Sequence, residues 1–148
     1  MRAIDLDQLE GPKSVRSFRR GRHPMTMLLL VMLAGAVGVG ARYGLNIWIT
    51  ERFDAGFPWA TLLINVVGCA AIGFVAFAAE RTGGNLHGAQ VPIAVGLLGG
   101  FTTFSSYALE AVTLAVDGAA VRALVYVGVT NVAGLVGASI GVLGARSV

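Results

Sequence analysis

Long apolar runs dominate the chain, and short polar stretches separate them. Four such runs cover residues 26–50, 59–79, 91–115 and 119–144. Each is near or above the roughly 20 residues that a helix needs to cross a bilayer. The connections between them are short, at residues 51–58, 80–90 and 116–118. The pattern therefore predicts an all-α membrane protein with four transmembrane helices running up-down-up-down and with both termini on one side.

The third run is interrupted by polar and flexible residues. Gly99 and Gly100 stand at its centre and are followed by four hydroxyl residues, Thr102, Thr103, Ser105 and Ser106. A double glycine loosens a helix, and the hydroxyls can bond the backbone groups that this frees. In hydrocarbon such a break survives only where it is buried in protein or lines a wet cavity. Transporters hold ions at breaks of this kind. We therefore expect a break in the third helix at these glycines and a small-ion site beside it.

Small residues recur at four-residue spacing in two of the runs. The first run has Gly40 and Gly44, and the fourth has Gly137 and Gly141. Such strips allow helix backbones to pack closely. Because four helices alone enclose little space for a pore, we also expect an oligomer.

Polar side chains inside the first two runs need partners. Arg42 lies about eight residues, or roughly 12 Å, from the end of its helix. It either snorkels to the membrane interface or provides a fixed positive charge that attracts anions or pairs with a neighbour. Thr61 and Asn65 share one face of the second helix. Asn65 either bonds across helices or offers its amide to something in a cavity.

Two aromatic rings follow the break at helical spacing. Phe104 and Tyr107 share a face if the helix resumes there, and they serve either plain packing or contact with an anion through their electropositive ring edges. Ser106 and Glu110 lie four residues apart on an adjacent face. Glu110 is either a solvated charge or an acid at a channel vestibule. The sequence leaves open the roles of three polar residues in the fourth run, Tyr126, Thr130 and Asn131.

Composition supports the membrane assignment. The chain has 148 residues, of which 55% are hydrophobic and 13% charged, against about 25% charged in soluble domains. Residues 1–24 carry six Lys or Arg against three acids, so we expect a basic, disordered tail near anionic lipid rather than a nucleic-acid surface. The domain proper is expected at residues 25–148.

Several function classes find no support. Cys69 is the single cysteine, and His23 and His87 lie outside the apolar runs, so no metal-ligand cluster is evident. The sequence shows no nucleophile–base arrangement, and we expect no enzyme. A signal-peptide interpretation of the first run fails because the run is too long for that role.

Three motifs together resemble those of the CrcB or Fluc fluoride channels. They are Gly-Gly-Phe-Thr-Thr-Phe-Ser at 99–105, Thr-Leu-Leu-Ile-Asn-Val-Val-Gly at 61–68 and Gly-Ala-Arg-Tyr at 40–43. The resemblance extends from about Met25 to the end of the chain. It implies a multi-pass protein of the inner (plasma) membrane that exports fluoride passively from the cytoplasm. It also implies an antiparallel, dual-topology dimer with two pores.

The resemblance also assigns site residues. A structural sodium ion at the dimer centre would be held by the carbonyls of Gly99 and Thr102. Fluoride would pass the edges of Phe104 and Tyr107 and the amide of Asn65. The matching polar pathway consists of Ser105, Ser106, Glu110, Thr61 and Arg42.

Two features depart from the family's pattern. Tyr107 stands where the family has a second phenylalanine, and its hydroxyl needs a partner. In addition, the basic tail favours one insertion direction, although Arg81 and Arg146 on the N-terminal side otherwise balance Arg52 and Arg122 on the other. Either the natural start is Met25 or Met27, or the tail is tolerated, or the chain pairs with an oppositely oriented paralogous subunit. We favour the first or the third.

Two other functions remain as alternatives. Small four-helix proton-coupled multidrug exporters depend on a glutamate inside the first helix, whereas this run holds no acid before Glu51 and its internal charge is Arg42. The third candidate is a non-conducting membrane subunit, in which the glycine strips serve assembly alone.

Overall fold

The chain folds into the four predicted spans. The computed structural model describes residues 24–53, 56–81 and 89–147. The helices are α2 (Pro24–Thr50), α3 (Trp59–Arg81), η2 (Pro92–Leu98), α4 (Gly99–Phe101), α5 (Phe104–Val116) and α6 (Ala120–Arg146). Four stretches are long and apolar enough to cross a membrane, the third being the combined span Pro92–Val116. The predicted tail at residues 1–24 lies outside the described part except for Pro24, where α2 begins.

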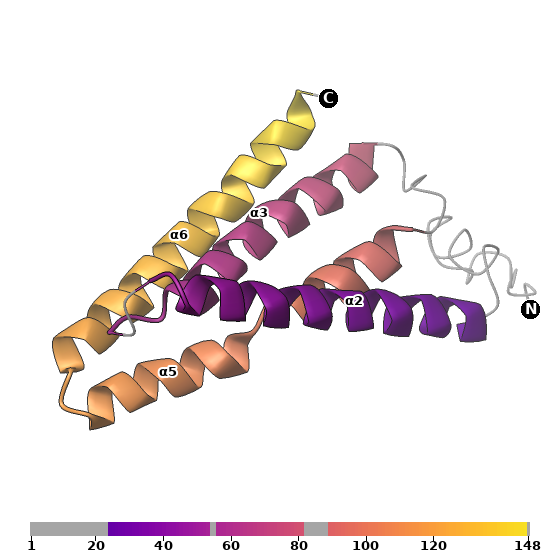
Figure 1. The fold of residues 1–148 in the computed structure, drawn as a ribbon. Helices are drawn as coiled ribbons and strands as arrows, with labels where there is room; N and C mark the ends of the chain where they lie inside the picture. Colours follow the sequence, from indigo (N-terminus) through magenta and orange to yellow (C-terminus); the bar gives the residue numbers. More distant parts are fainter. Residues whose placement is uncertain (1–23, 54–55, 82–88, 148) are drawn as a thin grey trace, which may run out of the picture.

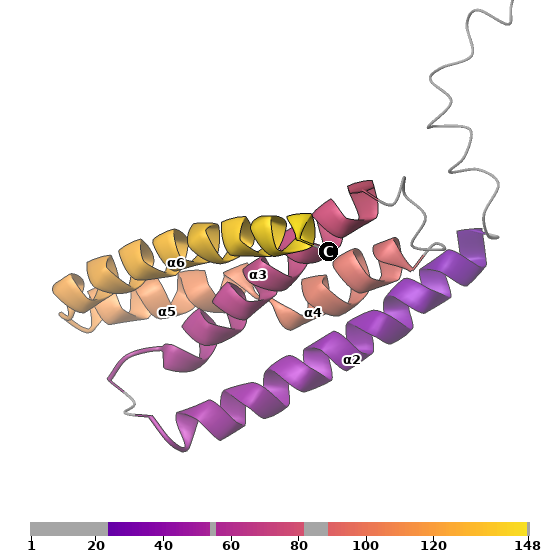
Figure 2. The same ribbon diagram turned by 90° about the horizontal axis from the view of Figure 1, so that it is seen from above.

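The spans pack as two close pairs. The most extensive contact is between α3 and α6, while α2 packs mainly on η2 and α4. Figures 1 and 2 show α3 and α6 side by side, with the third span drawn as two helical halves. The start of α2 and the ends of α3 and α6 point to the same side of the bundle (Figure 1), as the short connections predicted.

Glycines bring the backbones of each pair together. A Cβ on Gly141 of α6 would collide with the Ala70 carbonyl of α3, and one on Gly137 would lie 3.0 Å from the Val66 carbonyl oxygen. The small-residue strip predicted in the fourth run is therefore confirmed as a packing surface. The strip predicted in the first run is not, because a Cβ on Gly40 or Gly44 would meet open space within the described residues.

A different set of glycines makes the contact between the first and third spans. A Cβ on Gly100 would lie 2.7 Å from the Gly35 carbonyl oxygen, and Gly38 faces the Leu97 carbonyl so closely that a Cβ would collide with it. Close glycine packing by α2 is confirmed on another face, and packing by the Gly40–Gly44 strip stays a prediction. Gly35 and Gly38 face the third span, whereas Gly40 and Gly44 lie on the outward side.

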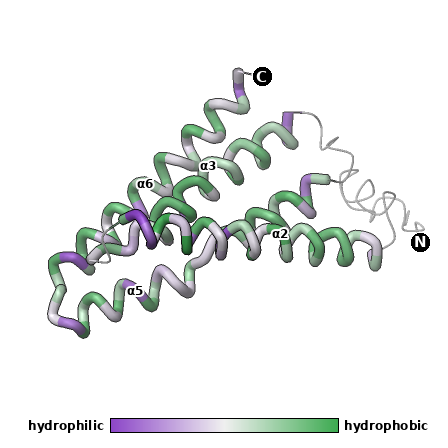
Figure 3. Tube along the Cα trace, viewed as in Figure 1, coloured by the Kyte–Doolittle hydropathy of each residue, from purple (hydrophilic) through white to green (hydrophobic). Residues whose placement is uncertain are grey.

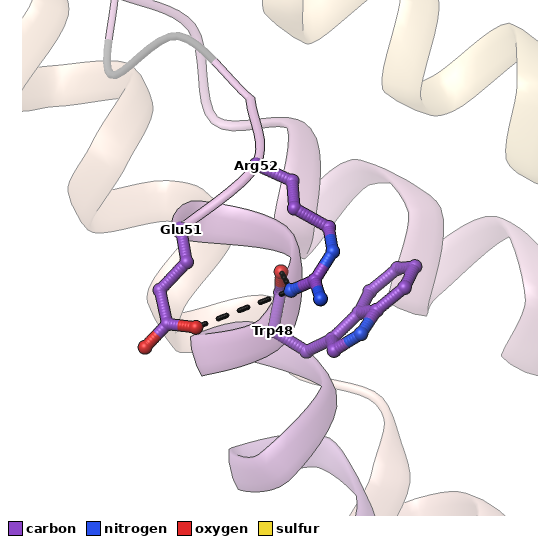
Figure 4. Close-up of polar contacts among 3 residues, drawn as sticks. All are labelled: Trp48, Glu51 and Arg52. Atoms are coloured by element: carbon purple, nitrogen blue, oxygen red, sulfur yellow. Dashed lines mark hydrogen bonds and ion pairs between the residues drawn. The ribbon is translucent and has the colours of Figure 1, made fainter.

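Polar side chains gather at the helix ends, as membrane insertion requires. Figure 3 shows mostly hydrophobic colouring along α2, α3 and α6, a more polar α5, and hydrophilic segments near helix ends and connections. At the end of α2 the guanidinium of Arg52 donates to the Trp48 carbonyl (3.1 Å), lies 4.4 Å from the Trp48 ring centroid and reaches Glu51 at 4.0 Å (Figure 4). Tryptophan and arginine in this arrangement are typical of a membrane–water interface.

Two arginines, Arg81 and Arg146, lie at the end of the bundle opposite Arg52. Arg81 donates to the carbonyls of Ala145 and Arg146, so the ends of α3 and α6 lie together. Arg122 donates to the Gly56 carbonyl at the end that also holds Arg52. The predicted balance of two arginines at each end of the bundle is therefore confirmed.

Candidate functional site

The break in the third span falls at two threonines. Thr102 has φ −80° and ψ 160°, and Thr103 has φ −150° and ψ 113°, both in the extended region. Gly99 keeps helical angles, with φ −65° and ψ −35°. The predicted break is therefore present, but its location at the two glycines was wrong. Gly100 is needed for the close approach to Gly35, not for an unusual conformation.

Asn65 of α3 binds the backbone at the break. Its Nδ2 donates to the Thr103 carbonyl (3.0 Å), and its Oδ1 accepts from the Thr103 N–H (2.8 Å). The side-chain amide thus replaces the helical hydrogen bond that the Thr103 N–H gives up and adds a second donor to the Thr103 carbonyl, which as the N-cap carbonyl also accepts the first bond of α5. Of the two interpretations of Asn65, the structure shows the bond across helices. The second hydrogen on Nδ2 leaves the amide able to donate again.

Thr103 also starts the second half of the span. Its hydroxyl oxygen accepts from the Ser106 N–H (3.2 Å), while its own O–H donates to the Ser106 hydroxyl oxygen (3.0 Å). The Ser105 hydroxyl lies 3.3 Å away. The bond from the Ser106 N–H is the helix N-cap arrangement that threonine favours. The sequence analysis gave Thr103 no role of its own. The signal was present, because a threonine directly before a resumed helical pattern is a candidate N-cap.

The two carbonyls predicted to bind sodium are among those that the break releases. A continuous helix would bond the Gly99 carbonyl to the Thr103 N–H and the Thr102 carbonyl to the Ser106 N–H. The first of these donors goes to Asn65 and the second to the Thr103 hydroxyl. Unwound backbone carbonyls at a helix break are ligands that sodium takes in transporters. The chemistry of this donor set therefore fits the predicted ion.

Arg42 reaches the other side of the same break. Its Nε donates to the Gly100 carbonyl (3.1 Å), so the half-buried guanidinium satisfies a carbonyl near the end of α4. A continuous helix would bond that carbonyl to the Phe104 N–H instead. The arginine thus pairs with a neighbour, which is one of the alternatives the sequence left open.

The break lies beside a groove between α3, the two halves of the third span and α6. The groove has a volume of about 440 Å³, and its lining is mostly apolar. Five predicted site residues line it, namely Asn65, Gly99, Thr102, Phe104 and Tyr107. Two polar residues of α6, Thr130 and Asn131, line its other side. The Thr130 hydroxyl is buried, and no partner for it exists among the described residues.

The two predicted aromatic residues share a face. Their ring centroids lie 5.6 Å apart with the planes inclined by 53°. Phe104 is 79% exposed in the single chain, so its ring stands open at the surface. Tyr107 is less exposed and leans on Tyr126, with 5.4 Å between the ring centroids.

The Tyr107 hydroxyl has a partner on α6. Asn131 Nδ2 donates to it at 2.7 Å, and the same nitrogen donates to the Val127 carbonyl at 2.7 Å. The hydroxyl by which Tyr107 differs from the family's phenylalanine therefore has a hydrogen-bond partner. Helical spacing could not predict this pair, because the two residues are 24 positions apart and lie in different helices.

A second polar group surrounds Glu110, just under one helical turn beyond Tyr107 on α5. The Thr61 hydroxyl donates to Oε1 and the Tyr126 hydroxyl donates to Oε2, both at 2.7 Å. Thr61 and Tyr126 are buried. Glu110 also lines a smaller cavity of about 250 Å³ together with Asn46 and Trp59. Glu110 is therefore bonded by two hydroxyls and is not a free solvated charge, and its role as an acid at a channel vestibule stays a prediction.

The predicted site residues therefore fall into three neighbouring groups. The groove holds Asn65, Phe104 and Tyr107 together with the two carbonyl residues. Ser105 and Ser106 cluster around Thr103 at the start of α5. Thr61 and Glu110 form the group with Tyr126, and Arg42 binds the far side of the break. Sequence reasoning found most of these residues but missed the contacts of Thr103, Tyr126 and Asn131.

Comparison with known proteins gives a consistent result. Residues 29–142 match the family model described as CrcB-like protein, Camphor Resistance (CrcB). The chain is 42% identical over 100 residues to a protein of Roseiflexus sp. (strain RS-1) named fluoride-specific ion channel FluC, covering 68% of this chain and 81% of that one. It is 40% identical over 123 residues to a protein of the same name from Trichormus variabilis, covering 82% and 87%. A third, from Thermus thermophilus, is 46% identical over 99 residues, covering 66% and 76%.

Proposed function

The chain belongs to the CrcB family, and on this basis we propose that it is a fluoride-selective channel that lets fluoride leave the cytoplasm passively. Its activity is ion conduction and not enzymatic catalysis. An open, selective leak lowers a toxic internal concentration without an energy source, since fluoride trapped inside runs down its own gradient. The observation that carries the proposal is the groove in which Asn65, Phe104 and Tyr107 meet beside the helix break.

The chemistry of the groove suits a small, strongly hydrated anion. Ring edges of Phe104 and Tyr107 offer weak positive contacts, and the Asn65 amide retains one N–H beyond its bond to Thr103. Conduction needs binding that is strong enough to admit the ion and weak enough to release it. Amide, hydroxyl and ring-edge donors without a full cation meet that requirement.

We further propose that sodium binds the released carbonyls of Gly99 and Thr102, where it would hold the break in shape. The support is the diversion of the two N–H donors that a continuous helix would supply to these carbonyls. Replacing all sodium with a large organic cation should then stop fluoride flux, while equal flux without sodium would contradict this assignment.

The active form in this proposal is a dimer of oppositely oriented subunits. The support is the open groove, the 79% exposure of Phe104 and the apolar outward face of α2, on which Leu33 is 67% exposed and Val37 63%. A second subunit would close the groove and cover these side chains. Whether the partner is a second copy or a paralogue depends on how strongly the basic tail favours one direction of insertion. We propose that the assembly lies in the inner (plasma) membrane.

The multidrug-exporter alternative has less support. That class needs a buried acid in the first helix, and the charge inside α2 is Arg42, already bound to the Gly100 carbonyl. A non-conducting subunit remains distinguishable by experiment, because it predicts no flux through the groove.

The test is fluoride efflux from liposomes. Purified protein is reconstituted into vesicles loaded with fluoride, and release is followed with a fluoride electrode and, in parallel, a chloride electrode. Fast fluoride release without chloride release supports the channel, and Phe104→Ile should abolish it. The matched control is Phe74→Ile, which changes a 41% exposed phenylalanine on α3 outside the groove. Absence of fluoride flux from folded protein, also with a co-expressed paralogue, would refute the proposal.

A further inference from the structure

The hydrogen-bond polarity at Asn131 can be assigned from its neighbours. One nitrogen, Nδ2, lies 2.7 Å from both the Val127 carbonyl oxygen and the Tyr107 hydroxyl oxygen. A backbone carbonyl can only accept, so the atom facing it must be the amide nitrogen and not the amide oxygen. The carbonyl of Val127 therefore fixes the orientation of the whole side-chain amide.

This orientation decides how the Tyr107 hydroxyl bonds. An amide nitrogen has no acceptor capacity, so the hydroxyl must accept from Asn131. Its own hydrogen is left to point elsewhere, and Tyr107 lines the groove together with Asn65, Phe104 and Thr130. A hydroxyl that accepts a hydrogen bond is polarised and becomes a stronger donor.

We propose that the Tyr107 hydroxyl, oriented by Asn131, is a hydrogen-bond donor to fluoride in the groove. This inference rests on the proposed function and deepens it. Where a phenylalanine would offer a ring edge, this chain offers an O–H group. Tyr107 is then a binding residue, and Asn131 is a positioning residue that acts through it.

Surroundings in the groove favour a small anion as the acceptor. The ring of Tyr107 contacts Phe104 and Tyr126, with centroid distances of 5.6 Å and 5.4 Å, and its hydroxyl oxygen is bonded by Asn131. Charge-assisted hydrogen bonds are roughly twice as strong as neutral ones. An ion that leaves part of its hydration shell at this point would take the O–H in place of water.

The experiment is a double-mutant cycle on fluoride efflux in liposomes. It uses the full-length protein as Tyr107→Phe, Asn131→Leu and the two combined. Tyr107→Phe keeps the ring and removes only the donor, so fluoride flux should fall about tenfold, the loss expected for a hydrogen bond to a charged group. Asn131→Leu should also lower flux, because the hydroxyl loses its orientation. The double variant should match Tyr107→Phe, since Asn131 has nothing left to orient.

Controls separate this inference from general damage and from the proposed function. Tyr43→Phe removes a hydroxyl from a 69% exposed tyrosine on α2 and should leave flux unchanged. If the wild-type protein conducts and Tyr107→Phe conducts equally or better, the donor is refuted while the channel stands. If Asn131→Leu lowers flux as much in the Tyr107→Phe background as alone, the positioning role is refuted. If the wild-type protein conducts neither alone nor with a co-expressed paralogue, both proposals fail. Should Asn131→Leu fail to fold, Tyr107→Phe alone decides on the donor.

Discussion

Asn65 and Thr103 exchange two hydrogen bonds across the bundle, at 2.8 and 3.0 Å between the amide of one and the backbone of the other. The pair joins α3 to the one point of the third span where the helix is extended. In a bilayer no water is present to satisfy that backbone, so a side chain must do so. The extended backbone at the break therefore requires a side chain such as asparagine at position 65 that can both donate and accept.

Replacing that amide should destabilise the protein. Asn65→Ala leaves the Thr103 N–H without its acceptor and removes one of the donors to the Thr103 carbonyl, and we expect a loss of about 1–3 kcal/mol in the free energy of unfolding. Denaturation in detergent, followed by circular dichroism, measures it. Asn46→Ala is the control, because among the described residues its amide makes only an exposed 3.4 Å contact with Thr50. Equal stability of the two variants would contradict the role given to Asn65.

Two glycines of α6 should respond in opposite ways to one methyl group. Gly141→Ala places a Cβ against the Ala70 carbonyl and forces α3 and α6 apart, at an expected cost of about 1–3 kcal/mol. Gly128→Ala adds the same group where no described atom lies within 4 Å, so it should be neutral or stabilising, as alanine is the better helix former. Thermal unfolding in detergent compares them. A larger loss of stability in Gly128→Ala than in Gly141→Ala would contradict the close contact assigned to Gly141.

Arg42 should matter more than an arginine at the helix end. Arg42→Leu removes a charge-assisted bond to the Gly100 carbonyl inside the bundle, and we expect a loss of about 1.5–3 kcal/mol. Arg52→Leu removes an exposed group whose ion pair with Glu51 is 4.0 Å long, and exposed pairs contribute about 0–1 kcal/mol. Unfolding titrations of both variants test the order. A larger loss for Arg52→Leu would reverse the assignment.

Both carboxylate oxygens of Glu110 should be needed to accept the hydrogen bonds of Thr61 and Tyr126. In Glu110→Gln one acceptor oxygen becomes an NH₂ group, so either Thr61 or Tyr126 loses its acceptor, with an expected cost of about 1–3 kcal/mol. Combining it with Tyr126→Phe should cost less than the sum of the two single changes, because the groups share one network. Stability measurements on the three variants suffice, and strict additivity would show that Tyr126 and Glu110 are not coupled.

Local sequence pattern was a good guide wherever the physical cause is local. The four spans were predicted to within a few residues, and the shared face of Phe104 and Tyr107 follows from helical spacing. Glycine spacing in the fourth run identified the surface that packs on α3. The same rule did not identify the face of α2 that meets its own chain, because spacing cannot distinguish a surface that packs within the subunit from one that faces lipid or another subunit.

The position of the break shows a second limit. Two glycines made the third span look weakest at residues 99 and 100, yet both glycines stay in the helical half, and the two threonines are extended. Glycine permits a break but does not require one. The extended stretch lies where Asn65 and the Thr103 hydroxyl together supply replacement hydrogen bonds, and that arrangement exists only after α3 has packed.

The sequence by itself determined the membrane-spanning architecture, since a bilayer requires long apolar helices whose backbone groups are bonded internally. It also determined which residue types would stand near the break. Only the tertiary structure decided their partners: Asn65 with Thr103, Arg42 with the Gly100 carbonyl, Glu110 with Tyr126, and Asn131 with Tyr107. These pairs lie 16 to 58 positions apart, so each depends on the packing of whole helices, which no local pattern encodes.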